Sequence, residues 1–302
     1  MHSTLAATPP ATAAAPSGAV EIVRRVLSLP DDELDYAEAK LAFDRAIDPA
    51  IDADAVTAEL DSMAATAREL AGASPDDHAR LNALRKLIYQ SGPWNGHRPF
   101  GYDHSDPLGT RIRGKLLSNY LATRRGQCVS MPILFLILGE RLGLDLALAT
   151  APEHVFVRHR DRQGRVVNLE TTSGAHPASD AKMRQGFPMT DLSVRNGLYL
   201  RSLPKREAVA EMASTLVEHL AEKGRHYDVL WITWEILRHS PRNIHAILSR
   251  GTAYGHLIET EIVKKYPMPF LLPVHLRSRY EALCQRHKAA FDTADALGWA
   301  PE

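Results

Sequence analysis

The chain has 302 residues, 45% of them hydrophobic and 24% charged, which is ordinary globular composition with room for one large or two medium domains. Thirty-six basic residues balance thirty-six acidic ones, which argues against broad binding to nucleic acid or to an anionic membrane, since both need a basic excess or a basic face. No run of eighteen apolar residues is present, so we expect no membrane span.

The N-terminus and the cysteines bear on the cellular compartment. Residues 1–20 are rich in Ala, Pro, Thr and Ser and lack the basic start and apolar stretch of a secretory signal, so we expect a flexible tail. Cys128 and Cys284 are the only cysteines, which excludes a disulfide framework. The simplest location is a reducing cytoplasm.

Residues 21–110 predict a helical N-terminal region that ends in an aromatic loop. Apolar residues recur at steps of four and three, as on one face of a helix, at Val56, Leu60, Met63, Ala67 and Leu70. From residue 91 to 110, Gly, Pro, Asn and Asp are dense and are mixed with large aromatic rings. Because such rings are seldom left in solvent, we expect an ordered loop there.

An almost wholly apolar helix follows, from about Cys128 to Gly143. Pro132 fits only if this helix begins near Cys128, because proline is tolerated in the first turn of a helix. A helix N-terminus favours a thiolate, the nucleophilic form of cysteine. Gly126 permits a tight entry that would expose the sulfur.

Two short β-rich segments, 154–159 and 165–170, predict a hairpin whose turn contains Gly164 in a left-handed conformation. If the turn centres near Arg162, the residue numbers of any two residues that face each other across the hairpin add to about 324. His154 then faces Glu170. The carboxylate would then accept the imidazole N–H and orient the ring. Residues 197–200 are a candidate for a further strand.

These residues together predict a thiol site, although each taken alone is more often structural. Cys128 would be the nucleophile, His154 its base and Glu170 the group that orients the histidine. The backbone N–H of Cys128 is the natural first oxyanion donor, and the candidates for a second donor are Gln127, Asn119 and Trp94. No histidines and acids stand at metal-ligand spacing, so we expect neither metal nor cofactor. Cys284 is interpreted as a helix-packing thiol.

Residues 204–302 predict a degenerate helical-repeat region. If Pro241 closes one tetratricopeptide repeat, Gly251 and Tyr254 fall at the glycine and tyrosine positions of the next, and Leu216 fits the repeat before. The prolines at 267 and 269 interrupt the second repeat early. Helices of this kind form concave surfaces for peptides or partner proteins.

The segments GQCVSMPILFLILGERLGL, PEHVFVRH and VNLETTSG, in this order, resemble the core of bacterial transglutaminase-like proteins with a tetratricopeptide tail. The resemblance covers roughly residues 111–255. It implies a papain-like fold in which Cys128, His154 and Glu170 match the catalytic triad. Better-known transglutaminases have Asp at the third position, where this chain has the longer Glu170.

We therefore expect an α+β protein with a flexible tail (1–20), a helical N-terminal region (21–110), a papain-like core (111–203) and a tetratricopeptide-like region (204–302). The expected function is thiol-dependent acyl transfer on an amide of a peptide or protein substrate, with water or an amine as acceptor. The alternative is a non-catalytic scaffold that binds a protein partner on its C-terminal helices. We expect neither nucleic acid nor a membrane as partner.

Overall fold

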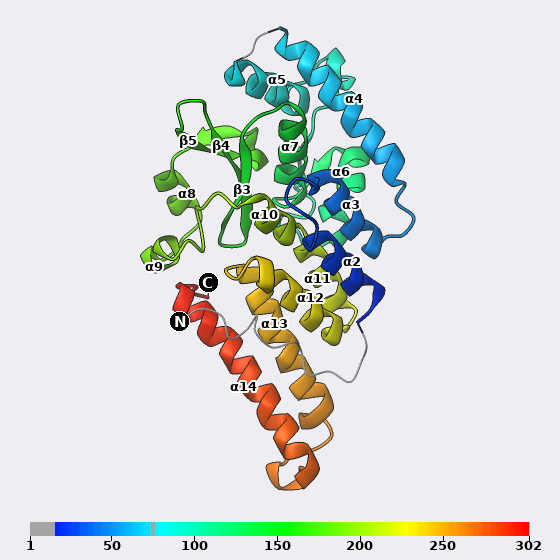
Figure 1. Ribbon diagram of the computed structural model, residues 1–302, viewed down its shortest axis with the longest axis vertical. Coiled ribbons are helices and arrows are strands. Elements are labelled where there is room, and N and C mark those ends of the chain that lie inside the picture. The colour runs from blue at the N-terminus through cyan, green and yellow to red at the C-terminus, as the bar shows by residue number, and fades with distance from the viewer. Residues whose placement is uncertain (1–15, 74–75, 302) are drawn as a thin grey trace.

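The computed structural model describes residues 16–73 and 76–301. It shows a helical body with a small sheet at one side and a hairpin of two long helices, α13 and α14, that projects from the body (Figure 1). Most of the expected flexible tail lies outside the described residues. Its last part was predicted wrongly, because helix α2 already begins at Gly18.

The N-terminal region is helical, as predicted. Its helices are α2 (Gly18–Leu27), α3 (Tyr36–Ile47), α4 (Ala53–Ala71) and α5 (Asp77–Tyr89). Three of them begin at an aspartate whose carboxylate accepts a backbone N–H of the first turn: Asp35 for α3, Asp52 for α4 and Asp76 for α5. The predicted aromatic loop follows, with the short helix η1 (Pro93–Asn95) and strand β1 (Gly101–Tyr102).

The middle of the chain contains the sheet and the helices around it. The helices are η2 (Ile112–Lys115), α6 (Leu117–Thr123), α7 (Ser130–Arg141), η3 (Thr171–Ser173), α8 (Asp180–Gly186) and α9 (Asp191–Arg195). The strands are β2 (Arg125–Gly126), β3 (Leu146–Ala151), β4 (His154–Arg160), β5 (Val166–Glu170) and β6 (His176–Ala178). Strands β3 to β6 form an antiparallel meander in chain order, and β1 pairs in parallel with β2.

The predicted hairpin is present as β4 and β5, with Gly164 at φ +77° in the turn. Its register differs from the prediction, because Val157 faces Leu169 and the facing numbers add to 326. The turn is therefore centred one residue later than Arg162, and Glu170 lies diagonally from His154. Since side chains alternate along a strand with a period of two, a shift of two leaves both residues on the same face.

One expectation about a strand was wrong, and one strand was not predicted. Residues 197–200 do not form a strand, because the segment bends and both Gly197 (φ +66°) and Leu200 (φ +57°) take left-handed conformations. The segment still lies along β3, since the Leu200 N–H donates to the Thr150 carbonyl (3.0 Å) and the Leu203 N–H to the Leu148 carbonyl (2.8 Å). Strand β3 itself, LALATA, was not predicted because alanine is a weak strand former.

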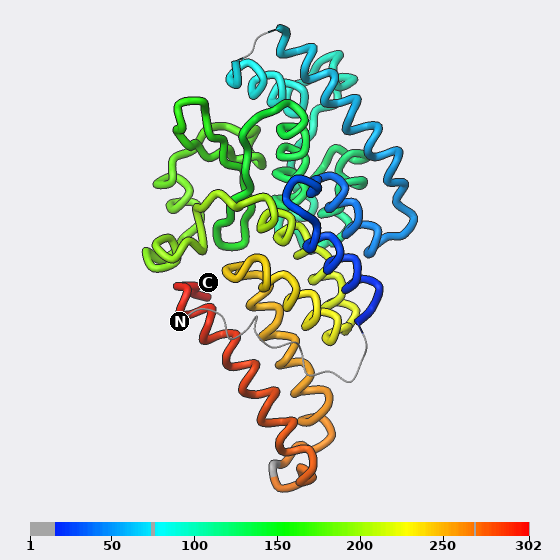
Figure 2. Tube along the Cα trace, viewed as in Figure 1, coloured from blue at the N-terminus to red at the C-terminus, as the bar shows by residue number. Residues whose placement is uncertain are grey.

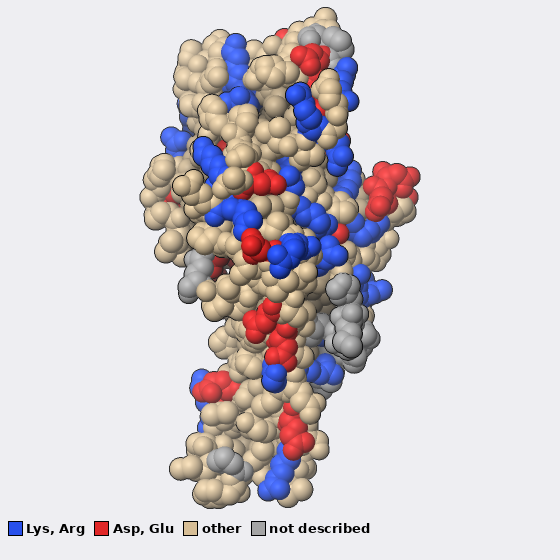
Figure 3. All heavy atoms as spheres, turned by 90° about the vertical axis from the view of Figure 1, so that its left-hand side faces the viewer, with Lys and Arg blue, Asp and Glu red and all other residues tan. Residues whose placement is uncertain are grey.

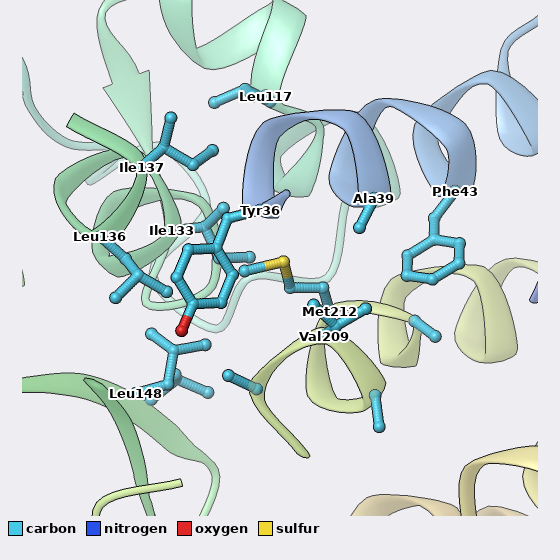
Figure 4. Packing of buried hydrophobic residues seen from close by; sticks show 14 of the residues in the cluster. Tyr36, Ala39, Phe43, Leu117, Ile133, Leu136, Ile137, Leu148, Val209 and Met212 are labelled. Atoms are coloured by element: carbon cyan, nitrogen blue, oxygen red, sulfur yellow. The ribbon is translucent and has the colours of Figure 1, made fainter. Parts of the chain in front are cut away.

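Helix α7 is the centre of the core. Every residue from Ser130 to Gly139 is buried, because the sheet covers one side of the helix and the N-terminal helices cover others. Figure 4 shows Ile133, Leu136 and Ile137 of α7 facing Tyr36 of α3 and Leu148 of β3. The same apolar cluster continues into α10, so the N-terminal helices, the sheet and the first C-terminal helices share one core.

The C-terminal region is helical. It contains α10 (Lys205–Met212), α11 (Ser214–Glu222), α12 (His226–His239), α13 (Ile244–Leu257), the π-helix η4 (Ile258–Val263), the short helix η5 (Pro269–Leu271) and α14 (Val274–Leu297). Helices α13 and α14 pack closely at Gly251, where an added Cβ would lie 2.7 Å from the ring of Phe291. Helical pairing alone does not identify a tetratricopeptide repeat, which stays a prediction.

A helix of the N-terminal region packs against a helix of the C-terminal region. Helix α2 lies beside α12 (Figure 2), and Arg24 of α2 makes a 2.6 Å ion pair with the buried Glu235 of α12. The described part of the chain contains no helix that is long and apolar enough to cross a membrane.

Candidate active site

Cys128 lies in the turn that leads from β2 into α7. The Met131 N–H donates to the Gln127 carbonyl (3.0 Å), which is a helical hydrogen bond, so Cys128 stands in the first turn at the N-terminal end of α7. The entry is as tight as predicted, because a Cβ on Gly126 would lie 2.6 Å from the ring of Tyr120. The thiol is partly exposed, and its Sγ lies 3.8 Å from the carbonyl oxygen of Glu153.

His154 is the first residue of β4, directly after a two-residue turn that joins it to β3. The turn holds Glu153 at φ +48°, a left-handed conformation that is unfavourable for a residue with a Cβ. His154 is 8% exposed, and its imidazole stacks on the ring of Phe187 with 4.2 Å between ring centroids and an interplanar angle of 11°. The turn before His154 and the stacking of its ring on Phe187 together restrict the position of the histidine.

Glu170 is the last residue of β5 and contacts His154 directly. Its Oε2 lies 2.7 Å from Nε2 of the imidazole. Its Oε1 accepts hydrogen bonds from the backbone N–H (3.0 Å) and the hydroxyl (2.7 Å) of Thr172. One carboxylate oxygen is therefore anchored to the start of η3 and the other is directed at the histidine. The extra methylene of glutamate is accommodated in this geometry.

Electrostatics favour the charged forms of both groups. Burial disfavours the imidazolium, but hydrogen bonds to Cys128 and Glu170 outweigh it and raise the pKa of His154 to about 9. Burial would also raise the pKa of Glu170, but the hydrogen bonds from His154 and Thr172 hold that pKa below its ordinary value. At neutral pH the pair is therefore an imidazolium beside a carboxylate, with Nδ1 as the remaining ring nitrogen.

The structure brings one proposed oxyanion donor to the thiol. The backbone N–H of Cys128 makes no hydrogen bond within residues 16–73 and 76–301, so this donor is free to bind a substrate oxygen. It stands at the positive end of the α7 dipole, which adds to its effect on an anion.

Two of the other proposed donors are engaged elsewhere. The Gln127 side chain is fully buried and its Nε2 donates to the Asp106 carbonyl (2.8 Å). The indole N–H of Trp94 is shared between the carbonyls of Lys86 and Gln90 (both 3.1 Å). We therefore correct both proposals, because neither group faces the thiol as a free donor.

Asn119 and Trp94 lie on secondary-structure elements that carry none of the three residues Cys128, His154 and Glu170. Asn119 is on α6, and its Oδ1 accepts a hydrogen bond from Nε of Arg113 (3.1 Å). Trp94 instead lines a hollow of about 450 Å³ beside α4, together with Arg98 and Arg124.

Three further residues belong to the site. Thr172 was present in the sequence motif Asn168–Glu170–Thr172, but its role in anchoring the carboxylate needed the structure. Phe187 follows α8 in a loosely patterned stretch, and no sequence signal indicated that it stacks on His154. Tyr102 of β1 is also close to the site, since it pairs with Gly126 of β2, two residues before Cys128, and burial, followed by Cys128, raises its pKa. Its hydroxyl donates to the Pro107 carbonyl (2.8 Å).

Cys284 lies on α14, far along the chain from the sheet, and is partly exposed. Within the described residues, no group of three or more His, Cys, Asp and Glu side chains could hold a metal ion.

Parts of the chain are similar to known proteins. Residues 54–188 match the model of the transglutaminase-like superfamily, so the chain contains a transglutaminase-like domain that spans α4 to the segment after α8. The chain is also similar to a UPF0162 protein of Vibrio cholerae serotype O1, with 24% identity over 230 residues that cover 75% of this chain and 81% of the relative. No solved structure matches significantly.

Proposed function

We propose that the protein catalyses thiol-dependent acyl transfer on an amide bond of a peptide or protein. The observation that carries the proposal is the 2.7 Å contact between His154 and Glu170, on the same face of the sheet and beside Cys128 at the start of α7. The matching transglutaminase-like domain supports the same chemistry.

The reaction begins when Sγ of Cys128 attacks the amide carbonyl and the carbonyl oxygen moves toward the backbone N–H of Cys128. Because His154 is an imidazolium at neutral pH, the sulfur attacks with its proton already on Nδ1 of His154, and the imidazolium gives this proton to the leaving amine as the C–N bond breaks. The product is a thioester on Cys128. Glu170 holds the ring in place and stabilises its positive charge throughout.

In the second half of the reaction, an acceptor attacks the thioester and loses its proton to His154. Water as acceptor completes a peptidase or amidase cycle, whereas an amine completes a transamidase cycle. The acceptor meets the site from the exposed side of Cys128, since His154 is covered by Phe187. A reducing cytoplasm is the compartment we propose, because it would keep Cys128 a free thiol.

The experiment is to trap the thioester. The full-length protein is mixed with p-nitrophenyl acetate, and the acetyl group is located by mass spectrometry, with and without a primary amine such as cadaverine. We expect acetylation at Cys128, none in Cys128→Ala, and turnover that requires His154. Acetyl–cadaverine would identify an amine acceptor and free acetate would identify water. Acetylation of Cys128 and Cys284 at equal rates would overturn the proposal and leave the non-catalytic scaffold.

A further inference from the structure

The outer end of the α13–α14 hairpin, residues 263–278, carries an unusual set of exposed apolar side chains; we call it the arm tip. The side chains are exposed to 79% at Phe270, 77% at Val274, 54% at Met268 and 49% at Leu271. With Val263, they are five of the eight large hydrophobic residues that are exposed in the described part of the chain. Such clustering marks an interaction site, since scattered single residues are the norm on a protein surface.

Within the arm tip every Lys, Arg, Asp or Glu side chain is a basic one, and Glu261 and Glu281 flank this segment. No Asp or Glu occurs from residue 262 to residue 280. Lys264, Lys265 and Arg277 are exposed there, and none of the three forms an ion pair within the described residues. In Figure 3 the lower end of the molecule is largely tan, with blue Lys and Arg atoms beside it. The arm tip is therefore an apolar end with a basic collar on a chain whose net charge is zero.

Three prolines reduce the number of backbone N–H donors in the arm tip. Pro267, Pro269 and Pro273 have no N–H, and the Leu271 N–H donates to the Met268 carbonyl (2.8 Å). A free N–H that leaves water without a partner costs several kcal/mol, so proline lowers the cost of moving this segment into an apolar medium. The composition thus suits a segment that leaves water.

The base of the arm is fixed, so the tip is presented in one orientation. Arg279 of α14 binds Glu261 of η4 through two contacts (2.7 and 3.1 Å), and the Tyr227 hydroxyl of α12 bonds to both residues. Beneath the exposed residues, Ile262 and Leu272 are buried. The apolar residues at the end are therefore exposed by a packed structure and not by local unfolding.

We propose that the arm tip inserts into the surface of a lipid bilayer that contains anionic headgroups. Phe270, Met268, Leu271 and Val274 would enter the interfacial layer, while the basic collar contacts the headgroups. A partner that binds an amphipathic helix fits less well, because these residues are divided between the bend at Met268, the short helix η5 and the first residue of α14, and do not form one continuous helical face. A projecting end also reaches a flat surface without obstruction by the body (Figure 1).

This inference does not depend on the chemistry of Cys128. It departs from the expectation that no membrane is a partner, which rested on the zero net charge and the missing membrane span. The net charge of the whole chain does not describe the charge of a local surface patch, and contact with a membrane surface requires no membrane-spanning helix.

The test is co-sedimentation of the full-length protein with vesicles of phosphatidylcholine alone or mixed with phosphatidylglycerol. We expect binding to the anionic vesicles only. The variant Phe270→Ser/Val274→Ser should bind at least tenfold more weakly, because it loses the apolar contribution. Lys264→Gln/Lys265→Gln should bind roughly 25-fold more weakly, and added salt should imitate this change. The control Leu108→Ser/Val166→Ser removes exposed apolar residues elsewhere and should bind like the wild type.

Two results would overturn the proposal. One is the absence of binding to anionic vesicles, or binding that is unchanged in Phe270→Ser/Val274→Ser. The other is a concentration-dependent dimer without lipid that the same variant abolishes, since a second copy would then cover the arm tip. Far-ultraviolet circular dichroism and thermal melting of each variant show that the fold is intact, as expected for exposed side chains.

Discussion

Two pairs of oppositely charged side chains, Lys40–Asp44 in α3 and His154–Glu170 across the sheet, have similar contact lengths, 2.5 and 2.7 Å, but different surroundings. Lys40 and Asp44 are fully buried, and the second oxygen of Asp44 accepts the Leu117 N–H at the start of α6 (2.8 Å). The first pair, called the closed pair below, is surrounded by protein and joins α3 to α6. The second pair, called the open pair below, leaves one imidazole nitrogen for Cys128. This difference separates an ion pair that stabilises the fold from one that can take part in a reaction.

The largest effect is expected where the open pair is removed. His154→Ala should slow formation of the Cys128 thioester by ~10²–10⁴-fold, because no imidazole remains to hold the proton of the thiol during the attack. Rates of p-nitrophenol release measure the change. His275→Ala, an exposed histidine near the arm tip, is the control and should react like the wild type. An unchanged rate in His154→Ala would remove the distinction between the two pairs.

The closed pair should matter for stability and not for chemistry. Lys40→Met leaves the Asp44 carboxylate buried without its partner, which should lower the free energy of unfolding by about 3–5 kcal/mol in urea titrations. In Lys40→Met/Asp44→Asn most of this loss should be recovered, since the amide oxygen still accepts the Leu117 N–H. If the single variant also loses thioester formation while folded, the first pair is not purely structural.

The stability of the protein should fall in alkali because of the open pair. The pKa of His154 is about 9 in the folded protein, against about 6.5 in the unfolded chain, so the folded state binds the proton more tightly. This contribution is complete below pH 6.5 and is lost as the pH rises to 9, by an amount on the order of 3 kcal/mol. Urea unfolding between pH 6 and 9.5 measures it. Glu170→Gln should flatten the profile, and a profile equally steep in that variant would assign the effect to other groups.

The smallest effect concerns the strained turn before His154. Glu153→Gly relieves a left-handed conformation at φ +48°, but it also adds freedom to the unfolded chain. The net change should be stabilising by less than about 1 kcal/mol, with thioester formation at the wild-type rate, because the group near Cys128 is the backbone carbonyl. Thermal unfolding and p-nitrophenol release measure the two quantities. A large loss of rate would show that the Glu153 side chain takes part in the site.

The site could be predicted where local pattern decides the structure. Pro132 and the apolar run placed Cys128 at the start of α7, and the period of two kept His154 and Glu170 on one face despite the shifted register. No prediction was made for residues whose role depends on contacts between distant parts of the chain. Lys40 and Asp44 look like surface charges of a helix until α6 closes over them, and Phe187 reaches His154 from a loop.

Side-chain hydrogen bonds could not be predicted from the sequence either. Gln127 and Trp94 are plausible oxyanion donors by type, but their donors are taken by backbone carbonyls of a loop and of α5. Strand β3 was missed because its alanines are held by pairing with β4 and not by their own propensity.

The most direct test of a Cys128–His154–Glu170 site is the rate of iodoacetamide labelling at Cys128 and Cys284, followed by mass spectrometry from pH 5 to 10. Both thiols are partly exposed, so each serves as the reference for the other. In the wild type, Cys128 should be labelled faster than Cys284 at pH 6–7, and this advantage should disappear in His154→Ala and shrink in Glu170→Gln. Equal labelling of the two cysteines across the range, or an advantage that survives His154→Ala, would contradict the account.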